Sequence, residues 1–176
     1  FSAFAGSNIA RVMQSCAMQK KSPEEENEVS GTAEHTSLDI GVIGAGSWGT
    51  ALAMLLAHNH HRVTLWVYEK EVCDHISTRH ENHVFLPGVR LLESIHPTQS
   101  LLEACRGQEL LVSAVPSHLV RKILRSCVRH VEPHTLLVSV SKGIENKTLK
   151  PISGILQDVL PPHLSAHTSF LSGPSF

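Results

Sequence analysis

LDIGVIGAGSWGTALA, residues 38–53, is the stretch that decides the fold. Its first six residues have the apolar, β-branched character of a strand, and the residues from Trp48 onward have the character of an apolar helix. Three glycines, Gly44, Gly46 and Gly49, fall in the turn between the two segments. Such a turn is either a tight connection without a ligand or a cradle for a bound diphosphate, and the neighbouring sequence helps to distinguish the two.

Segments of strand and helix character alternate six times along the rest of the chain. Strands are expected at residues 38–43, 62–68, 94–96, 110–115, 135–140 and 168–171, and helices at 48–59, 69–81 and 100–106. Two more helices are expected to begin with Ser117 and Asn146 as N-terminal caps. This alternation predicts βαβ units and an α/β fold with a doubly wound, mostly parallel sheet.

Within a βαβ unit each glycine of the turn has its own role. Gly44 permits the tight turn, Gly46 allows the backbone to approach a pyrophosphate, and Gly49 lets the helix lie close to the strand. The helix N-terminus adds free N–H groups and the positive end of the helix dipole, which attract a diphosphate. The motif therefore favours a dinucleotide-binding, Rossmann-type domain over a turn without a ligand.

An acidic residue, Glu69, lies about 20 residues beyond the glycine motif, where a carboxylate can accept hydrogen bonds from the ribose of NAD. The alternative is that Glu69 is an ordinary first-turn residue of the next helix. Tyr68 stands where NADP-binding domains often carry an arginine for the 2′-phosphate, and Lys70 is a weaker substitute. These residues favour NAD and leave NADP open.

Three further loops follow predicted strands at the carboxyl edge of the sheet, where ligands of such sheets bind. They span residues 115–117, 141–145 and 172–176. Lys142 in the second loop is placed to hold a phosphate or a polarised carbonyl oxygen, and a solvated loop lysine is the alternative. The third loop offers glycine N–H groups and serine hydroxyls to an anion, and ordinary turn chemistry accounts for it equally well.

Composition narrows the classes of function. With 15 basic and 16 acidic side chains, the formal net charge of -1 gives no field that attracts nucleic acid or an anionic membrane. The sequence contains no apolar run approaching the roughly 18 residues that span a bilayer. The four cysteines form no CxxC pair and are expected to be buried, reduced thiols. Histidines within 58–61 and 80–83 lack partners at ligand spacing, so no metal site is expected.

Residues 1–37 differ in composition from the rest of the chain. The first 21 residues carry three basic residues and no acidic one, and the residues that follow are acidic and polar. The segment lacks apolar periodicity, which favours a disordered extension. The alternative is that residues 1–23 are a transit sequence for import into an organelle; otherwise a cytoplasmic location is expected.

Five motifs, in this order, resemble those of one enzyme family. GAGSWGTALA, ENHVFLPGVRL, SAVPSHLVRKIL, SVSKGIENKTL and FLSGPSF are similar to the NAD(P)-dependent glycerol-3-phosphate dehydrogenases of the bacterial type, over residues 38–176. Members of this family interconvert sn-glycerol 3-phosphate and dihydroxyacetone phosphate, which links carbohydrate metabolism to phospholipid biosynthesis. The resemblance implies that the cofactor is bound by Gly44, Ala45, Gly46, Ser47, Trp48, Gly49, Tyr68, Phe85 and Lys142. It implies that the substrate is bound by Lys142, Gly173 and Ser175.

The chain also departs from the family pattern. Phe85 is often tyrosine in the family, so a hydroxyl contact is lost there, and the position of Tyr68 is often basic in NADP-using members, which supports NAD. In the family a helical second domain follows SGPSF and carries the lysine that accepts the proton, so the resemblance places this general base beyond Phe176. The resemblance places this C-terminal domain outside the 176 residues, so we expect no catalytic residue among them and a homodimer formed through that domain.

Two alternative functions share the glycine motif. One is a stand-alone NAD-binding module without catalysis. The other is a different reductase resembling 6-phosphogluconate dehydrogenase, such as one that reduces ketopantoate. Such a reductase is not expected to carry both SKGIE and SGPSF.

Overall fold

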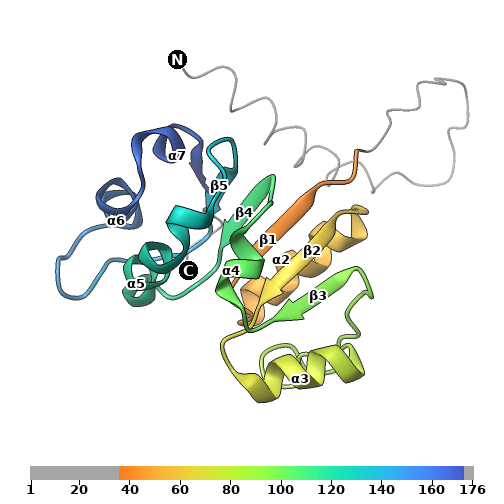
Figure 1. Ribbon diagram of the computed structural model, residues 1–176. Helices are drawn as coiled ribbons and strands as arrows, with labels where there is room; N and C mark the ends of the chain where they lie inside the picture. Colours follow the sequence, from red (N-terminus) through yellow and green to blue (C-terminus); the bar gives the residue numbers. More distant parts are fainter. Residues whose placement is uncertain (1–35, 173–176) are drawn as a thin grey trace, which may run out of the picture. The chain divides into compact units, whose positions relative to one another are not determined.

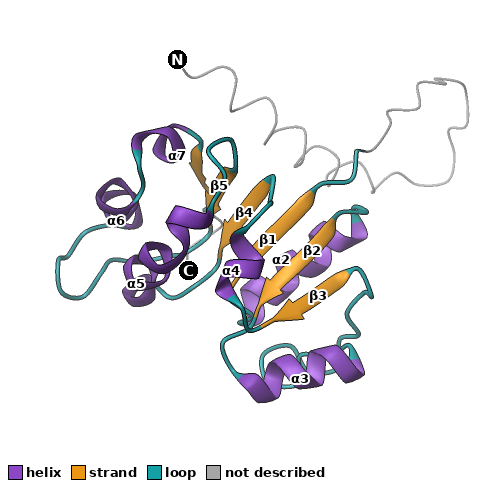
Figure 2. Ribbon diagram, viewed as in Figure 1, coloured by secondary structure: helices purple, strands orange, loops and turns teal. Residues whose placement is uncertain are grey.

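A six-stranded sheet with helices packed against it forms the framework of residues 36–172, which the computed structural model describes (Figures 1 and 2). The strands are β1 (Asp39–Ile43), β2 (Arg62–Trp66), β3 (Ile95–Thr98), β4 (Leu110–Ser113), β5 (Leu136–Ser139) and β6 (Thr168–Phe170). The helices are α2 (Ser47–His58), α3 (Lys70–Arg79), α4 (Leu101–Cys105), α5 (Ser117–Cys127), the short 3-10 helix η1 (Val128–His130), α6 (Ile152–Val159) and α7 (Pro162–Ala166).

The strand order is β3-β2-β1-β4-β5-β6, and each neighbouring pair is parallel. The chain builds outward from β1 to β3 and then crosses to the opposite side of β1 to begin β4. The order therefore reverses between β1 and β4, and in open α/β sheets ligands bind beyond the carboxyl ends of the strands at this point. The predicted doubly wound α/β fold is confirmed.

Both faces of the central strands are covered. Figure 2 shows α4 on one side of β1 and β2 and α2 on the other, and both helices pack against these two strands. The helices of βαβ crossovers cover both faces of a parallel sheet, so the sequence of a central strand is apolar throughout. In β1, Ile40, Val42 and Ile43 are fully buried. Gly41 has a specific reason to be glycine: a Cβ at this position would lie 2.0 Å from the Ala104 carbonyl oxygen of α4.

One continuous apolar cluster joins the sheet to the helices α4, α5, α6 and α7. The apolar stripe of α5 faces this cluster, with Val120, Leu124 and Cys127 buried and Ile123 packed against it. The members from the strands and from the helices around α5 are Ile43, Trp66, Leu111, Leu137, Ala104, Cys105, Ile152, Ile155, Leu156 and Leu164. The sheet is therefore held to α4, α5, α6 and α7 mainly by burial of apolar surface.

The structure corrects the two predicted caps. Ser117 is the first residue of α5, and its N-cap is Pro116. Asn146 caps no helix: residues 146–148 form a turn, and Leu149, which follows it, is 70% exposed and has a φ of 56°. The next helix, α6, begins only after Pro151, whose fixed φ suits a helix start. Helix α7 was not predicted, although Pro162 at its first position is a usual helix-start signal.

The predictions for thiols and for the N-terminal segment have different outcomes. Cys73, Cys105 and Cys127 are buried free thiols, as predicted, and burial raises the pKa of the Cys73 thiol. Cys16 and residues 1–35 lie outside the described residues, so the domain boundary predicted at residue 37 stays a prediction. Between residues 36 and 172, no helix is long and apolar enough to cross a bilayer.

Candidate functional site

The turn between β1 and α2 is built from close backbone contacts that only glycine permits. Gly44 has a φ of 111°, a left-handed conformation that favours glycine, and a Cβ there would lie 2.9 Å from the Ala114 carbonyl oxygen. At Gly49 a Cβ would lie 1.9 Å from the Gly44 carbonyl oxygen. The first turn of α2 therefore lies directly on the end of β1, as the sequence predicted for a close helix–strand approach.

Gly46 has a different environment. It is the N-cap residue of α2 with extended backbone, and a Cβ there would meet no atom within 4 Å. In the described part of the chain no side chain caps α2, and its first turn contains no acidic residue. The N-terminus of α2 thus presents backbone N–H groups and a positive dipole end on an open side, a geometry that fits a diphosphate.

Asn82 connects the glycine turn to the loop that carries Phe85. Its fully buried side-chain amide donates to the Ala45 carbonyl oxygen and to Thr50 Oγ1, both at 2.8 Å. Its side-chain oxygen accepts from the Phe85 backbone N–H at 3.1 Å. Ser47 Oγ closes the connection by donating to the Phe85 carbonyl oxygen at 2.6 Å. Asn82 was missed in the sequence, because a single amide residue in a loop carries no pattern that indicates burial.

The end of β2 lies next to the glycine turn. The Gly44 backbone N–H donates to the Trp66 carbonyl oxygen at 3.2 Å, and the Tyr68 ring packs edge-on against Trp66 at 6.0 Å between ring centroids. Tyr68 is 75% exposed, and Glu69 is the N-cap residue of α3. Lys70 forms an ion pair with Asp74 one helical turn away, which occupies the ammonium considered as a substitute for arginine.

The loop that carries Lys142 begins two residues after β5. Ser141 Oγ donates to the Val115 carbonyl oxygen at 2.6 Å, which ties this loop to the loop that follows β4. Gly143 has a φ of 99°, and Lys142 itself is exposed. Because Ala114 contacts the glycine turn, these residues connect β1, β4 and β5 along one edge of the sheet.

The last predicted loop of the site lies beyond the part of the chain that the structure describes. Gly173, Ser175 and Phe176 are outside the described residues, so the substrate contacts assigned to Gly173 and Ser175 stay predictions. The expectation that the family's general base lies beyond Phe176 also stays a prediction, because no described residue bears on it.

Two of the clustered histidines, His61 and His83, make contacts within the fold. His61 is buried, and its Nδ1 accepts from the Leu38 backbone N–H at 3.2 Å. The rings of His75 and His83 pack against each other at 4.1 Å between centroids, and His75 Nδ1 lies 2.9 Å from the Glu81 carbonyl oxygen. Among the described residues, no three His, Cys, Asp or Glu side chains gather closely enough to hold a metal ion.

The strand order, the glycine turn and the open N-terminus of α2 define a dinucleotide-binding domain of the Rossmann type. Comparison with known families identifies it further. The family described as NAD-dependent glycerol-3-phosphate dehydrogenase N-terminus matches residues 39–176, and the chain belongs to this family.

Relatives with known names agree with this assignment. The chain is 47% identical over 137 residues to a glycerol-3-phosphate dehydrogenase [NAD(P)+] of Citrifermentans bemidjiense, covering 78% of this chain and 41% of the relative. It is 42% identical over 139 residues to the enzyme of that name from Syntrophotalea carbinolica, covering 79% of this chain and 42% of the relative. The chain therefore spans about two fifths of the length of these curated relatives.

Solved structures show the same fold. The crystal structure of glycerol-3-phosphate dehydrogenase from Coxiella burnetii superimposes with a TM-score of 0.68 at 28% identity, covering 80% of this chain and 42% of that one. A ketopantoate reductase from Ralstonia eutropha aligns with a TM-score of 0.57 at 18% identity, covering 76% of this chain and 40% of that one. At that identity the second likeness concerns the fold alone, so it does not favour the alternative reductase.

Proposed function

We propose that these residues are the cofactor-binding part of an NAD(P)-dependent sn-glycerol-3-phosphate dehydrogenase, which interconverts sn-glycerol 3-phosphate and dihydroxyacetone phosphate. The observation that carries this proposal is the glycine turn within a chain of this family. Gly44 and Gly49 have no room for a side chain, whereas Gly46 leaves open space beside an uncapped helix N-terminus. A diphosphate needs that open approach to the backbone.

In this proposal the chain's residues bind and orient the cofactor. The backbone of residues 44–49 would hold the pyrophosphate, and Ser47, Trp48 and the Phe85 loop, which Asn82 ties to this turn, would be available to contact it. When bound, NAD accepts or donates the hydride, and the protein contributes binding, orientation and electrostatics. Trp48 is 52% exposed, so its ring is available for a ligand.

The preferred cofactor is NAD. Tyr68 provides no positive charge for a 2′-phosphate, and the ammonium of the neighbouring Lys70 is paired with Asp74. Glu69 lies three residues beyond β2, at the N-cap of α3, where its carboxylate can accept hydrogen bonds from both ribose hydroxyls. NADP remains the second cofactor, since the relatives are named for both forms.

The phosphate end of the substrate is assigned to Lys142 together with Gly173 and Ser175. Lys142 follows β5 at the carboxyl edge of the sheet, and the hydrogen bond of its neighbour Ser141 to the Val115 carbonyl oxygen ties it to the β4 loop that contacts the glycine turn. An ammonium at this edge can serve a cofactor phosphate and a substrate phosphate alike. The group that moves the proton is assigned to the part of the enzyme that corresponds to the rest of the relatives' length, beyond Phe176.

The proposal extends to the enzyme's place in the cell. Both proposed substrates and the cofactor are small, charged and water-soluble, which suits a cytoplasmic enzyme that supplies phospholipid biosynthesis from carbohydrate metabolism. Assembly as a homodimer through the substrate domain is part of the same proposal. Light scattering of the full-length enzyme tests the dimer, and cell fractionation tests the location.

The decisive experiment measures binding and turnover separately. The 176-residue chain should quench or shift NADH fluorescence on titration yet oxidise no NADH with dihydroxyacetone phosphate, because loss of general acid–base groups alone costs about 10²–10⁴-fold. The chain joined to the remaining domain of a relative should oxidise NADH with dihydroxyacetone phosphate and not with ketopantoate. Binding of NADH with no turnover by either protein would support the stand-alone module instead.

A further inference from the structure

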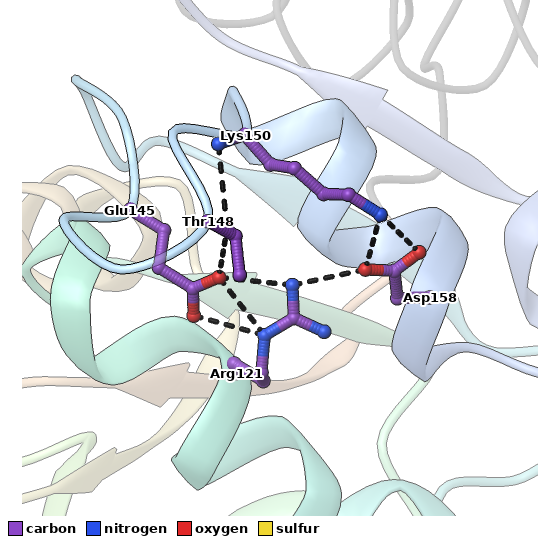
Figure 3. Close-up of polar contacts among 5 residues, drawn as sticks. All are labelled: Arg121, Glu145, Thr148, Lys150 and Asp158. Atoms are coloured by element: carbon purple, nitrogen blue, oxygen red, sulfur yellow. Dashed lines mark hydrogen bonds and ion pairs between the residues drawn. The ribbon is translucent and has the colours of Figure 1, made fainter.

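An ion-pair network links the Lys142 loop to the helices α5 and α6 (Figure 3). Arg121 of α5 places Nε 2.9 Å and 3.0 Å from the two carboxylate oxygens of Glu145, and its Nη2 lies 2.9 Å from Glu145 Oε2. The same Nη2 lies 2.9 Å from an oxygen of Asp158 on α6. A guanidinium that pairs with a carboxylate through two nitrogens fixes the orientation of both groups.

The network is sheltered from solvent at its centre. The side chains of Arg121 and Glu145 are 16% and 10% exposed, whereas those of the Arg62–Asp39 pair are 60% and 43% exposed. Thr148 Oγ1 donates to the Glu145 carboxylate, and Lys150 Nζ pairs with Asp158 at 2.8 Å. The hydrogen bond from Arg121, followed by that from Thr148, holds the pKa of the Glu145 carboxyl below its usual value.

The network restrains the backbone next to Lys142 from one side. Glu145, the centre of the network, is three residues after Lys142, and its backbone N–H donates to the Lys150 carbonyl oxygen at 2.9 Å. The Leu149 N–H in turn donates to the Glu145 carbonyl oxygen at 2.8 Å. A turn that exposes Leu149 and places its φ at 56° gains little from apolar burial, so these polar contacts keep it in place.

A second anchor lies on the other side of Lys142. Ser141 donates to the Val115 carbonyl oxygen, and Val115 is two residues before the start of α5, the helix that carries Arg121. Lys142 and Gly143 therefore lie between two residues, Ser141 and Glu145, whose side chains bond to α5 or to the loop directly before it. Because a lysine has a long and flexible side chain, the position of its backbone limits where its ammonium can reach.

We propose that Arg121 is a positioning residue, which acts through Glu145 to hold Lys142 at the cofactor edge of the sheet. The inference rests on the proposed function, in which Lys142 contacts the cofactor. Arg121 itself touches no ligand in this assignment. Its effect on ligand binding is therefore expected to pass entirely through Lys142.

A double-mutant cycle tests this on the 176-residue chain, with NADH affinity measured by fluorescence. Arg121→Met should weaken NADH binding roughly tenfold, within the range of coupling between residues of one network. In a Lys142→Met background the same substitution should change the affinity less than about twofold, since the group it positions is gone. If Arg121→Met does not fold, Arg121→Lys replaces it in the cycle, because it keeps the charge and loses only the two-nitrogen pairing.

Amide hydrogen exchange of the chain without cofactor gives an independent readout. Arg121→Met should accelerate exchange at the Glu145 and Leu149 amides, and Glu145→Gln should do the same. Arg62→Met is the matched control: it breaks an arginine–carboxylate pair at the opposite end of the sheet and should leave both NADH affinity and these amides unchanged.

The outcomes separate this inference from the function on which it rests. A parent chain that bound no NADH would overturn both. A parent that binds NADH, with equal losses from Arg121→Met in both Lys142 backgrounds, would overturn the positioning role alone. Unchanged exchange at Glu145 and Leu149 in a folded Arg121→Met variant would overturn it as well.

Discussion

The glycine turn and the Lys142 loop lie at the same edge of the sheet, but different forces hold them. In the glycine turn, backbone lies directly on backbone, and Gly49 has no space for a Cβ beside the Gly44 carbonyl oxygen. In the Lys142 loop, polar side chains provide the contacts, and the charged groups of Arg121, Glu145 and Asp158 join the loop to α5 and α6.

The difference shows how one site combines two kinds of rigidity. Close backbone packing does not depend on pH or salt, and it tolerates almost no substitution. An ion-pair network depends on protonation, and it can be loosened step by step by removing its outer members. We therefore expect substitutions in the turn to act abruptly and substitutions around the loop to act gradually.

The largest expected effect comes from filling the contact within the glycine turn. Gly49→Val should lower the free energy of unfolding by about 3 kcal/mol or more, because overpacking against backbone cannot be relieved by a side-chain rotation. Urea unfolding followed by circular dichroism measures this. Gly154→Ala in α6 is the matched control: its Cβ would meet only the flexible Lys150 side chain at 3.5 Å, so the variant should be at least as stable as the parent.

The second effect separates binding from folding within the same turn. Gly46→Val should fold with nearly unchanged stability, since a Cβ there enters open space, yet should lose NADH binding because the side chain blocks the approach to the backbone. Fluorescence titration and thermal unfolding of one sample measure both properties. Unchanged NADH affinity in the folded variant would show that the diphosphate binds elsewhere.

Lowering the pH should affect the Lys142 loop more than the glycine turn, because of these two regions only the loop contains an ion-pair network that titrates. The folded-state pKa of Glu145 lies below its ordinary value of 4.5, so its stabilising contribution is fully present above that value and is lost as pH falls through the folded-state pKa. Glu145→Gln should therefore lower Tm most at neutral pH, and the difference from the parent should shrink below pH 4.5. A constant difference across the titration would contradict this assignment. Asp39 and Asp158 also have lowered pKa values, so the variant keeps some acid sensitivity.

A more moderate effect is expected at the end of β2, where the site is open. Tyr68→Arg should shift the ratio of NADP to NAD affinity by about tenfold toward NADP, because a guanidinium pairs with the 2′-phosphate. Competitive titration with both cofactors measures the ratio. A parent chain that already binds NADP about ten times more tightly than NAD would show that Tyr68 and Glu69 have been misinterpreted.

The smallest effect is expected at the rim of the ion-pair network. Lys150→Met removes an exposed partner of Asp158 and leaves the pairing of Arg121 with Glu145 intact. Exposed ion pairs contribute little, so Tm should change by no more than about 2 °C. A loss of Tm as large as that of Arg121→Met would mean that the network has no sheltered centre.

Much of this fold was predictable because its signals are local. The alternation of apolar runs and amphipathic helices is a property of neighbouring residues, and it led to the correct sheet class. The predicted caps at Ser117 and Asn146 were wrong for a local reason as well, since the prolines at 116 and 151 decide where the helices begin. The roles predicted for Gly44 and Gly49 agree with the contacts observed there, whereas the ligand contacts of the site residues stay predictions.

By itself, then, the sequence determined the strand–turn–helix unit around Gly44–Gly49. The conformational freedom of glycine and the apolar character of the flanking segments are local properties of consecutive residues. Only the tertiary structure decided that Asn82 ties the Phe85 loop to this turn, that Gly41 admits the backbone of α4, and that Arg121 reaches Glu145. The sequence separations of these contacts are 24 residues or more. Burial and charge pairing over such separations depend on how the chain crosses the sheet, which no local pattern encodes.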